Sequence, residues 1–275
     1  MSFSEASRQL YISQSAVSQS IKSLEQKLGH QLFVRRTKKI SLTPEGETLY
    51  RHIIPAIHMI ETAEAQITEN NTLNGQLRIA ASDTICRYFL VPFLNRFHTE
   101  YPNVHIKVVN LTSSMCVDLL KQNQVDVIIA NTPTEQLKKC AYTYTVYEFR
   151  DVFVANPRYF NLTGLSLDII DQLPFITLER NTASSRSLHN IFRKYGKQLI
   201  PEIELSSNDL VLDLTKIGLG IGILPDYMLK NKEVNLRILN TDFDIPKRQL
   251  VLATNDTQES NPILQEFLTY FISEK

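Results

Sequence analysis

The chain has 275 residues, of which 43% are hydrophobic and 21% charged, which suits one large globular domain or two to three smaller ones. No apolar run approaches the roughly 20 residues that a membrane-spanning helix needs, and the polar first residues do not form a secretory signal. Three scattered cysteines, Cys86, Cys116 and Cys140, form neither a disulfide framework nor a Cys-x-x-Cys metal pattern. We therefore predict a cytoplasmic protein without a metal, in which these cysteines are small buried hydrophobic residues; a redox-sensing thiol is the alternative.

The formal net charge of zero conceals a basic N-terminal segment. Residues 1–51 carry eight basic and four acidic side chains, a net charge of +4, so the remaining residues sum to −4. A basic segment on an otherwise neutral protein favours a polyanion, such as nucleic acid, as the partner of that segment. An ordinary solvated surface would give the same count.

Two helices are predicted at the N-terminus. The first is short and amphipathic, with Ser2 or Ser4 as its cap. The second covers residues 14–28, is capped by Ser13 and ends at Gly29. One face of this helix is apolar, and the other carries short polar side chains of the kind that read base edges in a major groove. These side chains are Gln14, Ser15, Ser18, Gln19 and Lys22. A helical hairpin with a polar outer face is the alternative.

A basic hairpin is predicted to follow the second helix. Residues 31–34 and 40–42 have the pattern of two short strands, and residues 35–39 form a basic turn between them. A basic hairpin behind a recognition helix can contact phosphates or a minor groove, which sets affinity and its salt dependence rather than sequence preference. The basic side chains concerned are Arg35, Arg36 and Lys38.

The identity and register of these residues resemble the DNA-binding signature of LysR-type transcriptional regulators. The matching positions are Ala6, Leu10, Ser13, Gln14, Ala16, Val17, Ser18, Ile21, Leu24, Glu25, Leu28, Gly29, Leu32, Phe33, Arg35, Leu42, Thr43, Pro44, Glu45 and Gly46. The resemblance implies a winged helix-turn-helix that presents the polar set above to a major groove. Gln19 stands where the family often has arginine and Ser15 where it often has proline, departures that change the preferred bases rather than the binding of DNA.

The family has one further helix before these two. We expect that the sequence is incomplete at its N-terminus, and a shortened DNA-binding core is the alternative. The second helix is predicted to bury Val17, Ile21, Leu24 and Leu28, whereas a core that lacked the preceding helix would expose Leu10, Val17 and Ile21 and would have little stability to spare.

A long helix is predicted after Thr43, which caps it, with Pro44 at its first position. Pro55 is expected to bend this helix without ending it. Its apolar residues recur at alternating spacings of four and three, a seam that packs against another helix: Leu49, Ile53, Ala56, Ile60, Ala63 and Ile67. The resemblance implies that this seam joins copies of the chain into a dimer or a tetramer; packing on its own domain is the alternative. Residues 69–75 break the pattern and are predicted to form a hinge.

From residue 76 strands alternate with helices, a pattern typical of parallel α/β layers. Strands are predicted at 76–81, 104–111, 125–130, 175–178, 202–205, 220–224 and 249–254, and helices around 89–97, 115–123, 184–195, 209–217 and 262–272. Residues 216–225 match a glycine-rich helix-to-strand turn of the family, and the resemblance implies a two-lobed effector domain like a periplasmic binding protein.

The predicted architecture is therefore α+β and α/β in three parts. Residues 1–43 form a winged helix-turn-helix, 44–74 a linker helix and hinge, and 75–275 the effector domain. Lobe I comprises 75–155 and 252–275, and lobe II comprises 156–251, so the chain crosses between the lobes near Ala155-Asn156 and Leu250-Val251.

Ligands of open α/β sheets bind beyond the carboxyl ends of strands, where helix N-termini offer free N–H groups and positive dipoles. Hydroxyl and amide side chains at these ends favour a carboxylate-bearing small-molecule effector, with Arg180 or Arg186 as its ion-pair partner. The predicted effector-binding residues are Ser82, Thr84, Thr112, Ser113, Asn131, Arg180 and Thr182, and Ser114, Asn181 and Ser184 lie at the same ends. For each serine or threonine, a plain helix cap is the alternative.

Other classes of function fit the sequence less well. Gly218, Gly220 and Gly222 lack the G-x-G-x-x-G spacing of a nucleotide site and follow a helix instead of preceding one. The sequence contains no H-E-x-x-H and no G-x-S-x-G motif, so we predict no enzyme, no catalytic residue and no cofactor. A solute-binding module without a regulatory role is the remaining alternative, and ligand binding by a monomer that ignores DNA would support it.

Overall fold

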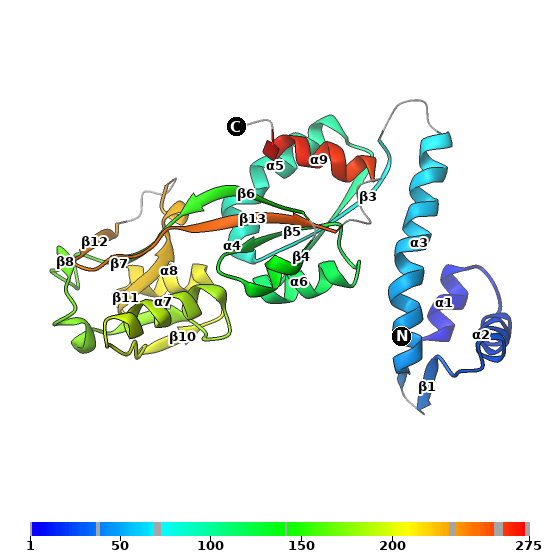
Figure 1. Ribbon diagram of the computed structural model, residues 1–275, viewed down its shortest axis with the longest axis horizontal. Coiled ribbons are helices and arrows are strands. Elements are labelled where there is room, and N and C mark those ends of the chain that lie inside the picture. The colour runs from blue at the N-terminus through cyan, green and yellow to red at the C-terminus, as the bar shows by residue number, and fades with distance from the viewer. Residues whose placement is uncertain are drawn as a thin grey trace. The chain divides into compact units, whose positions relative to one another are not determined.

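The computed structural model describes residues 2–36, 39–68, 73–140, 142–230, 235–255 and 261–272, apart from a few side chains within helices and strands. Contacts divide the chain into two compact units, Met1–Glu61 and Thr62–Lys275. Each unit has its own fold (Figure 1). None of the described helices is both long and apolar enough to cross a membrane.

The first unit begins with two helices, α1 (Phe3–Gln9) and α2 (Gln14–Leu28), as the sequence predicts. Ser13 caps α2 because its Oγ accepts the backbone N–H of Ala16 at 3.2 Å. At the other end Gly29 has a φ of +73°, a left-handed conformation that glycine adopts without strain. The sequence pattern therefore predicts both ends of α2 correctly.

Strands β1 (Phe33–Arg36) and β2 (Lys39–Leu42) form an antiparallel hairpin. β1 begins two residues later than predicted, since the Glu25 carboxylate accepts the backbone N–H groups of Leu32 and Phe33 at 2.8 and 3.3 Å. Arg35, Arg36 and Lys39 were predicted to lie in the turn, but the hairpin ladder includes them. Its last pair is Arg36–Lys39. Residues 37 and 38 lie outside the described residues.

Helix α3 (Pro44–Thr68) continues through Pro55 without a break. Thr43 caps it, since its Oγ1 accepts the backbone N–H of Gly46 at 3.0 Å and donates to the carbonyl of Gln31 at 2.7 Å. This capping residue therefore also ties the start of the helix to the segment before the hairpin.

The apolar residues of the first unit differ in exposure. Val17 is only 7% exposed, as the predicted apolar face of α2 requires, because α1 packs against α2. Leu10 is 62% exposed and Ile21 is half-buried, so these two lie where a core without the preceding helix would leave them more open to solvent.

The second unit contains a five-stranded sheet in the order β4-β3-β5-β13-β6. Its strands are β3 (Gly75–Ala81), β4 (Val104–Asn110), β5 (Val127–Asn131), β6 (Tyr142–Phe149) and β13 (Arg248–Thr254). β3, β4 and β5 are parallel, whereas β13 runs antiparallel to both of its neighbours. Helices α5 (Val91–Glu100) and α9 (Pro262–Ile272) cover one face, where Phe97 and Phe267 pack edge to face, and α6 (Ser113–Lys121) covers the other (Figure 1).

A six-stranded sheet in the order β10-β9-β11-β7-β12-β8 forms the second lobe. Its strands are β7 (Asp151–Ala155), β8 (Gly164–Leu165), β9 (Phe175–Leu178), β10 (Ile203–Leu205), β11 (Ile221–Pro225) and β12 (Arg237–Thr241). Helices α7 (Ala183–Lys194) and α8 (Asn208–Lys216) pack on it. The short helices are α4 (Asp83–Ile85), the π-helix η1 (Cys86–Leu90), and the 3₁₀ helices η2 (Glu135–Lys139), η3 (Ile170–Gln172) and η4 (Asp226–Met228).

The two crossings between lobes lie elsewhere than expected. β7, assigned to lobe I from the sequence, pairs with β11 and β12 of the second sheet. β13, whose first residues were assigned to lobe II, pairs along its whole length with β6 of the first sheet. The chain therefore crosses at Arg150 and just before Arg248, because the hydrogen-bond ladders change partner there.

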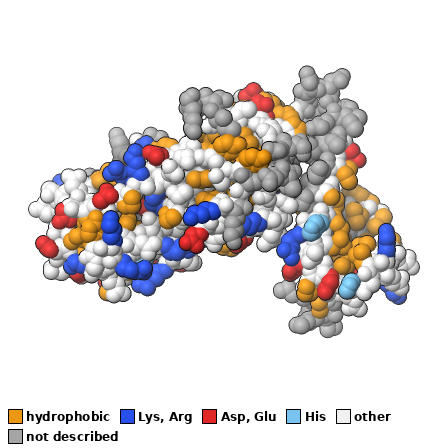
Figure 2. Space-filling view, in the orientation of Figure 1, with side chains coloured by type: hydrophobic (Ala, Val, Ile, Leu, Met, Phe, Trp, Pro, Cys, Tyr) orange, Lys and Arg blue, Asp and Glu red, His pale blue; other side chains and the backbone are white. Residues whose placement is uncertain are grey.

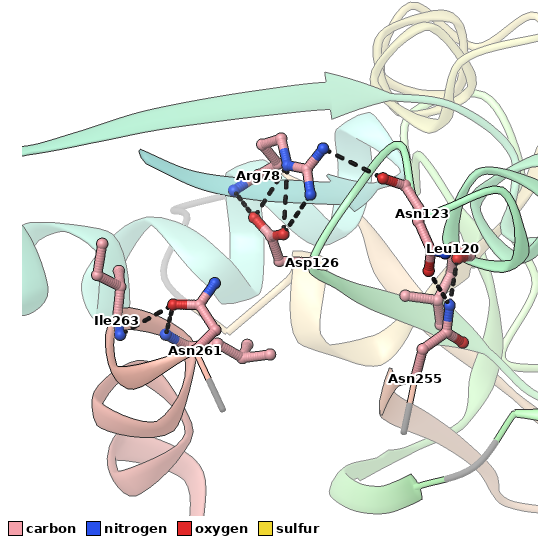
Figure 3. A network of polar contacts seen from close by, with 8 residues as sticks. Arg78, Leu120, Asn123, Asp126, Asn255, Asn261 and Ile263 are labelled. Atoms are coloured by element: carbon pink, nitrogen blue, oxygen red, sulfur yellow. Dashed lines mark hydrogen bonds and ion pairs between the residues drawn. The ribbon is translucent and has the colours of Figure 1, made fainter. Parts of the chain in front are cut away.

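A buried ion pair joins β3 to the segment before β5 (Figure 3). Asp126 accepts Nη2 of Arg78 at 2.6 Å and the backbone N–H of the same residue at 2.7 Å. The Arg78 guanidinium also donates to the carbonyl of Asn123 at 3.1 Å. With side chains only 9% and 5% exposed, the pair satisfies its own charges inside the lobe and is structural.

Candidate functional site

The N-terminal half of α2 presents the polar side chains that the sequence analysis selected. Gln14, Ser15, Gln19 and Lys22 are exposed, and Ser18 is half-buried. The first turn contains no acidic residue, so the positive end of the helix dipole is not offset there. This surface offers hydrogen-bond donors and acceptors, together with one cation, to a partner.

Two of these side chains are held by neighbours. Ser4 Oγ donates to Gln14 Oε1 at 3.2 Å, and the hydroxyls of Ser13 and Ser15 lie 2.8 Å apart. Such contacts reduce the number of conformations that the side chains can adopt before a partner binds. The other predicted DNA contacts, the side chains of Arg35, Arg36 and Lys38, lie outside the described part of the structure.

An apolar stripe runs along α3. Tyr50, Ile53, Ile57 and Ile60 are 42%, 37%, 44% and 57% exposed. Figure 2 shows hydrophobic side chains along the visible face of the first unit. Exposed large apolar residues at spacings of three and four are typical of a helix that packs against another chain. The side chains of Ala63 and Ile67, at the end of the predicted seam, are not described.

The two lobes of the second unit meet at two pairs of helix starts. In the first pair, Asn208 of α8 donates to Thr84 of α4 at 3.0 Å, and Tyr88 donates to Asp209 at 2.5 Å. This side also has an apolar contact, because Leu90 of the first lobe and Leu212 of the second share one buried core. Thr84 and Asn208 are each 7% exposed, so the hydrogen bond between them is buried.

The second pair comprises α6 of the first lobe and α7 of the second. Arg186 Nη2 donates to Ser114 Oγ at 3.3 Å across the lobes, and its Nη1 donates to the carbonyl of Asn181 at 2.7 Å. Thr182 caps α7 by accepting the N–H of Ser185 at 3.1 Å, whereas Thr112, in the cap position of α6, makes no side-chain cap bond.

The remaining predicted effector residues fall into distinct roles. Ser82 caps α4, because its Oγ accepts the backbone N–H of Ile85 at 3.4 Å. This is the role of a plain helix cap, the alternative to effector binding. Ser113 is buried, and its Oγ accepts the backbone N–H of Asn131 at 3.0 Å. Arg180 is 64% exposed and pairs with Glu204 at 3.7 Å, so its charge is already compensated. Thr84 accepts a hydrogen bond from Asn208 across the lobes, Thr112 and Thr182 precede α6 and α7, and Asn131 ends β5 beside Ser113.

Sequence reasoning missed a buried cluster around Arg248. Its guanidinium donates to Asp151 at 2.6 Å, to Ser184 Oγ at 3.0 Å and to the carbonyl of Thr132 at 2.7 Å. Arg248 and Asp151 are 3% and 2% exposed. In the sequence, each of these residues is the charged first residue of an apolar strand, Asp151 of β7 and Arg248 of β13. A charged residue at the end of a strand is ordinarily interpreted as exposed to solvent, so neither was selected.

The cysteines are not activated. Burial, aided by the charge of Asp83, raises the pKa of Cys86 to about 11, and burial raises the pKa of Cys116 to about 12. A raised pKa keeps a thiol protonated until the pH approaches that value, so reactive thiolate is scarce at neutral pH. Burial also raises the pKa of Cys140. The prediction of buried cysteines holds for Cys116, whereas Cys86 and Cys140 are half-buried, and the raised pKa of all three disfavours a redox-sensing thiol.

We expect iodoacetamide to alkylate Cys86 at neutral pH on the order of a hundredfold more slowly in the folded chain than in the urea-unfolded chain. The rate should rise with pH, because the thiolate forms only as the pH nears the raised pKa. Mass spectrometry of alkylated peptides measures both rates. Equal rates in the two states would instead support a redox-sensing thiol.

Comparison with known proteins places both units in one family. The sequence pattern "Bacterial regulatory helix-turn-helix protein, lysR family" matches residues 1–47, and "LysR substrate binding domain" matches residues 70–274. The chain is 25% identical over 275 residues to the HTH-type transcriptional regulator CysL of Bacillus subtilis, covering 97% of this chain and 90% of that protein.

Solved structures agree in fold. A full-length OxyR variant from Pseudomonas aeruginosa superposes with a TM-score of 0.74 at 16% identity, covering 98% of this chain and 91% of that one. The regulatory domain of Synechocystis CcmR, solved in complex with 2-PG, superposes with a TM-score of 0.64 at 22% identity, covering 72% of this chain and 96% of that one. The expected combination of a helix-turn-helix unit and a two-lobed α/β domain is confirmed.

Proposed function

The chain belongs to the LysR family of bacterial helix-turn-helix transcriptional regulators, and from this premise we propose how its residues read DNA and sense a small molecule. The observation that supports DNA reading is the exposed polar face of α2. Gln14, Ser15, Ser18, Gln19 and Lys22 enter a major groove, and Arg35, Arg36 and Lys38 of the hairpin contact the phosphate backbone or the adjacent minor groove.

The proposed regulator is a homo-oligomer, a dimer or a tetramer, joined through α3. The exposed stripe of Tyr50, Ile53, Ile57 and Ile60 supports this assembly, because burying it against a second helix removes apolar surface from water. A two-fold assembly also suits two DNA readers that recognise two related half-sites.

A small-molecule effector binds between the two lobes in this proposal. The hydrogen bonds that cross the junction support this position, since Asn208–Thr84 and Arg186–Ser114 join groups that separate if the lobes open. An effector that binds one lobe arrangement more tightly shifts the population toward it and, through the oligomer, changes the spacing of the DNA readers. Because its partner is the chromosome, we place the protein in the cytoplasm and assign it no catalytic role.

Replacing Gln19 with alanine is expected to weaken binding to the specific operator by about 1–3 kcal/mol, because a side chain that reads a base edge is lost. Binding to unrelated DNA should change little, since phosphate contacts dominate it. A mobility-shift titration with the DNA upstream of the protein's own gene, repeated across a salt series, measures both affinities.

The matched control is Gln26→Ala, which removes the same side chain from an exposed position nearer the end of α2. It should leave the operator affinity within about twofold of the parent chain, because it lies beyond the N-terminal half of a recognition helix. A parent chain that shows no specific, salt-sensitive shift contradicts the proposal and supports a ligand-binding module without a DNA-reading role.

A further inference from the structure

The turn between α1 and α2 has a backbone conformation that its residue disfavours. Tyr11 has a φ of +54°, in the left-handed region, where a residue with a Cβ is strained. Two hydrogen bonds fix this conformation: the N–H of Tyr11 donates to the carbonyl of Arg8 at 3.3 Å, and the N–H of Ile12 donates to that of Ser7 at 3.1 Å. This is the pairing of a Schellman motif at a helix end, in which the residue at the position of Tyr11 is ordinarily glycine or asparagine.

Other described helices of the chain end in the same conformation with residues that tolerate it. Gly29, Gly196 and Gly218 follow α2, α7 and α8, with φ angles of +73°, +70° and +82°, and Asn123 follows α6 with a φ of +53°. Glycine has no Cβ to clash, and asparagine is the side chain that most often shares this region with it. Tyr11 is therefore the exception among the described helix ends, and its bulk makes the conformation costly.

The side chain of Tyr11 does not offset this strain by packing. Tyr11 is 95% exposed, whereas Phe3 of the same unit packs its ring on Phe33 with centroids 5.4 Å apart. A ring that stays in water gains little free energy on folding, because it buries almost no apolar surface. A strained residue whose side chain is not used by the fold indicates a role for that side chain toward a partner.

The position of Tyr11 in the first unit identifies the partner. Tyr11 comes shortly before Ser13, which caps α2, and Gln14, the first residue of α2. In a helix-turn-helix the second helix contacts base edges with its N-terminal residues, while the first helix crosses the DNA backbone. The turn that joins them therefore lies beside the phosphates at the edge of the groove. A tyrosine hydroxyl is one of the neutral groups that donate hydrogen bonds to phosphate oxygens of DNA.

We propose that Tyr11 is a further DNA-contacting residue, and that its hydroxyl donates a hydrogen bond to a phosphate oxygen of the DNA backbone. The contact rests on the proposed function of α2 and adds a neutral phosphate contact to the basic ones of the hairpin. Because a phosphate carries no sequence information, this contact positions α2 in the major groove rather than selecting bases. The left-handed backbone of Tyr11 fixes the direction from which the ring reaches the DNA.

Tyr11→Phe and Tyr11→Gly separate the contact from the strain. Phenylalanine removes only the hydroxyl, whereas glycine removes the whole side chain and adopts a positive φ without strain. In mobility-shift titrations of the full chain with the DNA upstream of its own gene, we expect each variant to bind about fivefold more weakly, because a hydrogen bond is lost. The thermal unfolding midpoint of Tyr11→Gly should equal or exceed that of the parent chain, since the strain is relieved.

Two further measurements identify a phosphate as the acceptor. Tyr11→Phe should weaken binding to unrelated DNA by the same factor, and it should leave the salt dependence of the affinity unchanged, because a neutral tyrosine releases no counterion. Ethylation of single operator phosphates should interfere with binding of the parent chain at a phosphate in each half-site where it no longer affects Tyr11→Phe. An ethylation pattern that is the same for both proteins overturns the contact.

Tyr159→Phe is the matched control, since it removes the hydroxyl of a tyrosine that is 61% exposed in the second unit, and it should leave DNA affinity unchanged. A midpoint of Tyr11→Gly that falls together with its affinity overturns the contact, because Tyr11 then has a structural role. If both Tyr11 variants bind within about twofold of the parent chain while Gln19→Ala weakens operator binding, DNA reading stands and the Tyr11 contact is wrong. If the parent chain shows no specific binding, the proposed function is wrong and the contact with it.

Discussion

Asp126→Asn is expected to destabilise the effector unit by about 3–5 kcal/mol, because it leaves the buried Arg78 guanidinium without a compensating charge. Asparagine has nearly the same shape, so the loss comes from charge and hydrogen bonding rather than from a cavity. Asp126 receives both the guanidinium and the backbone N–H of Arg78, so one substitution weakens a side-chain pair and a main-chain contact together. Urea denaturation followed by far-ultraviolet circular dichroism measures the change in the free energy of unfolding.

Glu148→Gln makes the same acid-to-amide change in an exposed ion pair. Glu148 and Lys247 are joined at 3.0 Å, with side chains 50% and 59% exposed. Solvent screens such pairs, so the expected loss of stability is much smaller than that of Asp126→Asn. A similar loss in the free energy of unfolding in the two variants would mean that burial does not determine how much the Arg78–Asp126 pair contributes to stability.

Gly46→Ala is expected to disrupt the first unit, with a cost of about 3 kcal/mol from overpacking. A Cβ at this position would lie 2.1 Å from the carbonyl oxygen of Leu32 and 3.2 Å from Leu42 Cδ2. The carbonyl cannot yield easily, because it accepts the backbone N–H of Thr43 at 3.0 Å and precedes the hairpin directly. The hairpin must therefore shift relative to α3, and DNA affinity should fall by about tenfold or more as its phosphate contacts are lost.

Gly29→Ala serves as the comparison, since a Cβ there meets nothing within 4 Å but must adopt a φ of +73°. That change should cost about 1 kcal/mol through backbone strain alone and leave the hairpin in place. Thermal unfolding and operator titration of both variants distinguish the two effects. Equal losses of DNA affinity would show that the contact between Gly46 and Leu32 does not position the hairpin.

Local signals predicted the first unit well. The cap at Ser13, the left-handed Gly29 and the apolar spacing between them define α2 without reference to the rest of the chain. The start of β1 was misplaced because it depends on Glu25, a residue in the preceding helix whose carboxylate occupies two backbone donors. A contact of that kind has no signature in the alternation of apolar and polar residues.

Sequence reasoning missed several strands for different reasons. β6 is an edge strand with mostly half-buried and exposed residues, and β12 has only one buried residue, Leu239. β12 shows neither an apolar run nor strict alternation, whereas residues 142–146 of β6 alternate Tyr or Val with Thr, a strand signal that the sequence analysis overlooked. β7 is more apolar but is only five residues long, and its role depends on pairing with the distant β11 and β12.

The effector-binding residues selected from the sequence remain predictions, and the structure shows only where they lie. Loops after strands are visible in the sequence, so Thr84, Ser113 and Thr182 were selected, and each contacts a neighbour at a helix start. Arg248 was not selected, because its partners Thr132, Asp151 and Ser184 come from three segments that only the fold brings together. The selection of Arg180 rested on its position alone, which does not reveal that Glu204 pairs with it.

The place of β13 in the first sheet determines the order in which the lobes can be completed during synthesis. β13 lies between β5 and β6, yet its residues follow all strands of the second sheet in the chain. A polypeptide emerging from the ribosome therefore contains every strand of the second lobe while the first lobe still lacks an interior strand. The lobe that begins first is therefore finished last, because its interior strand β13 follows every strand of the second lobe in the chain.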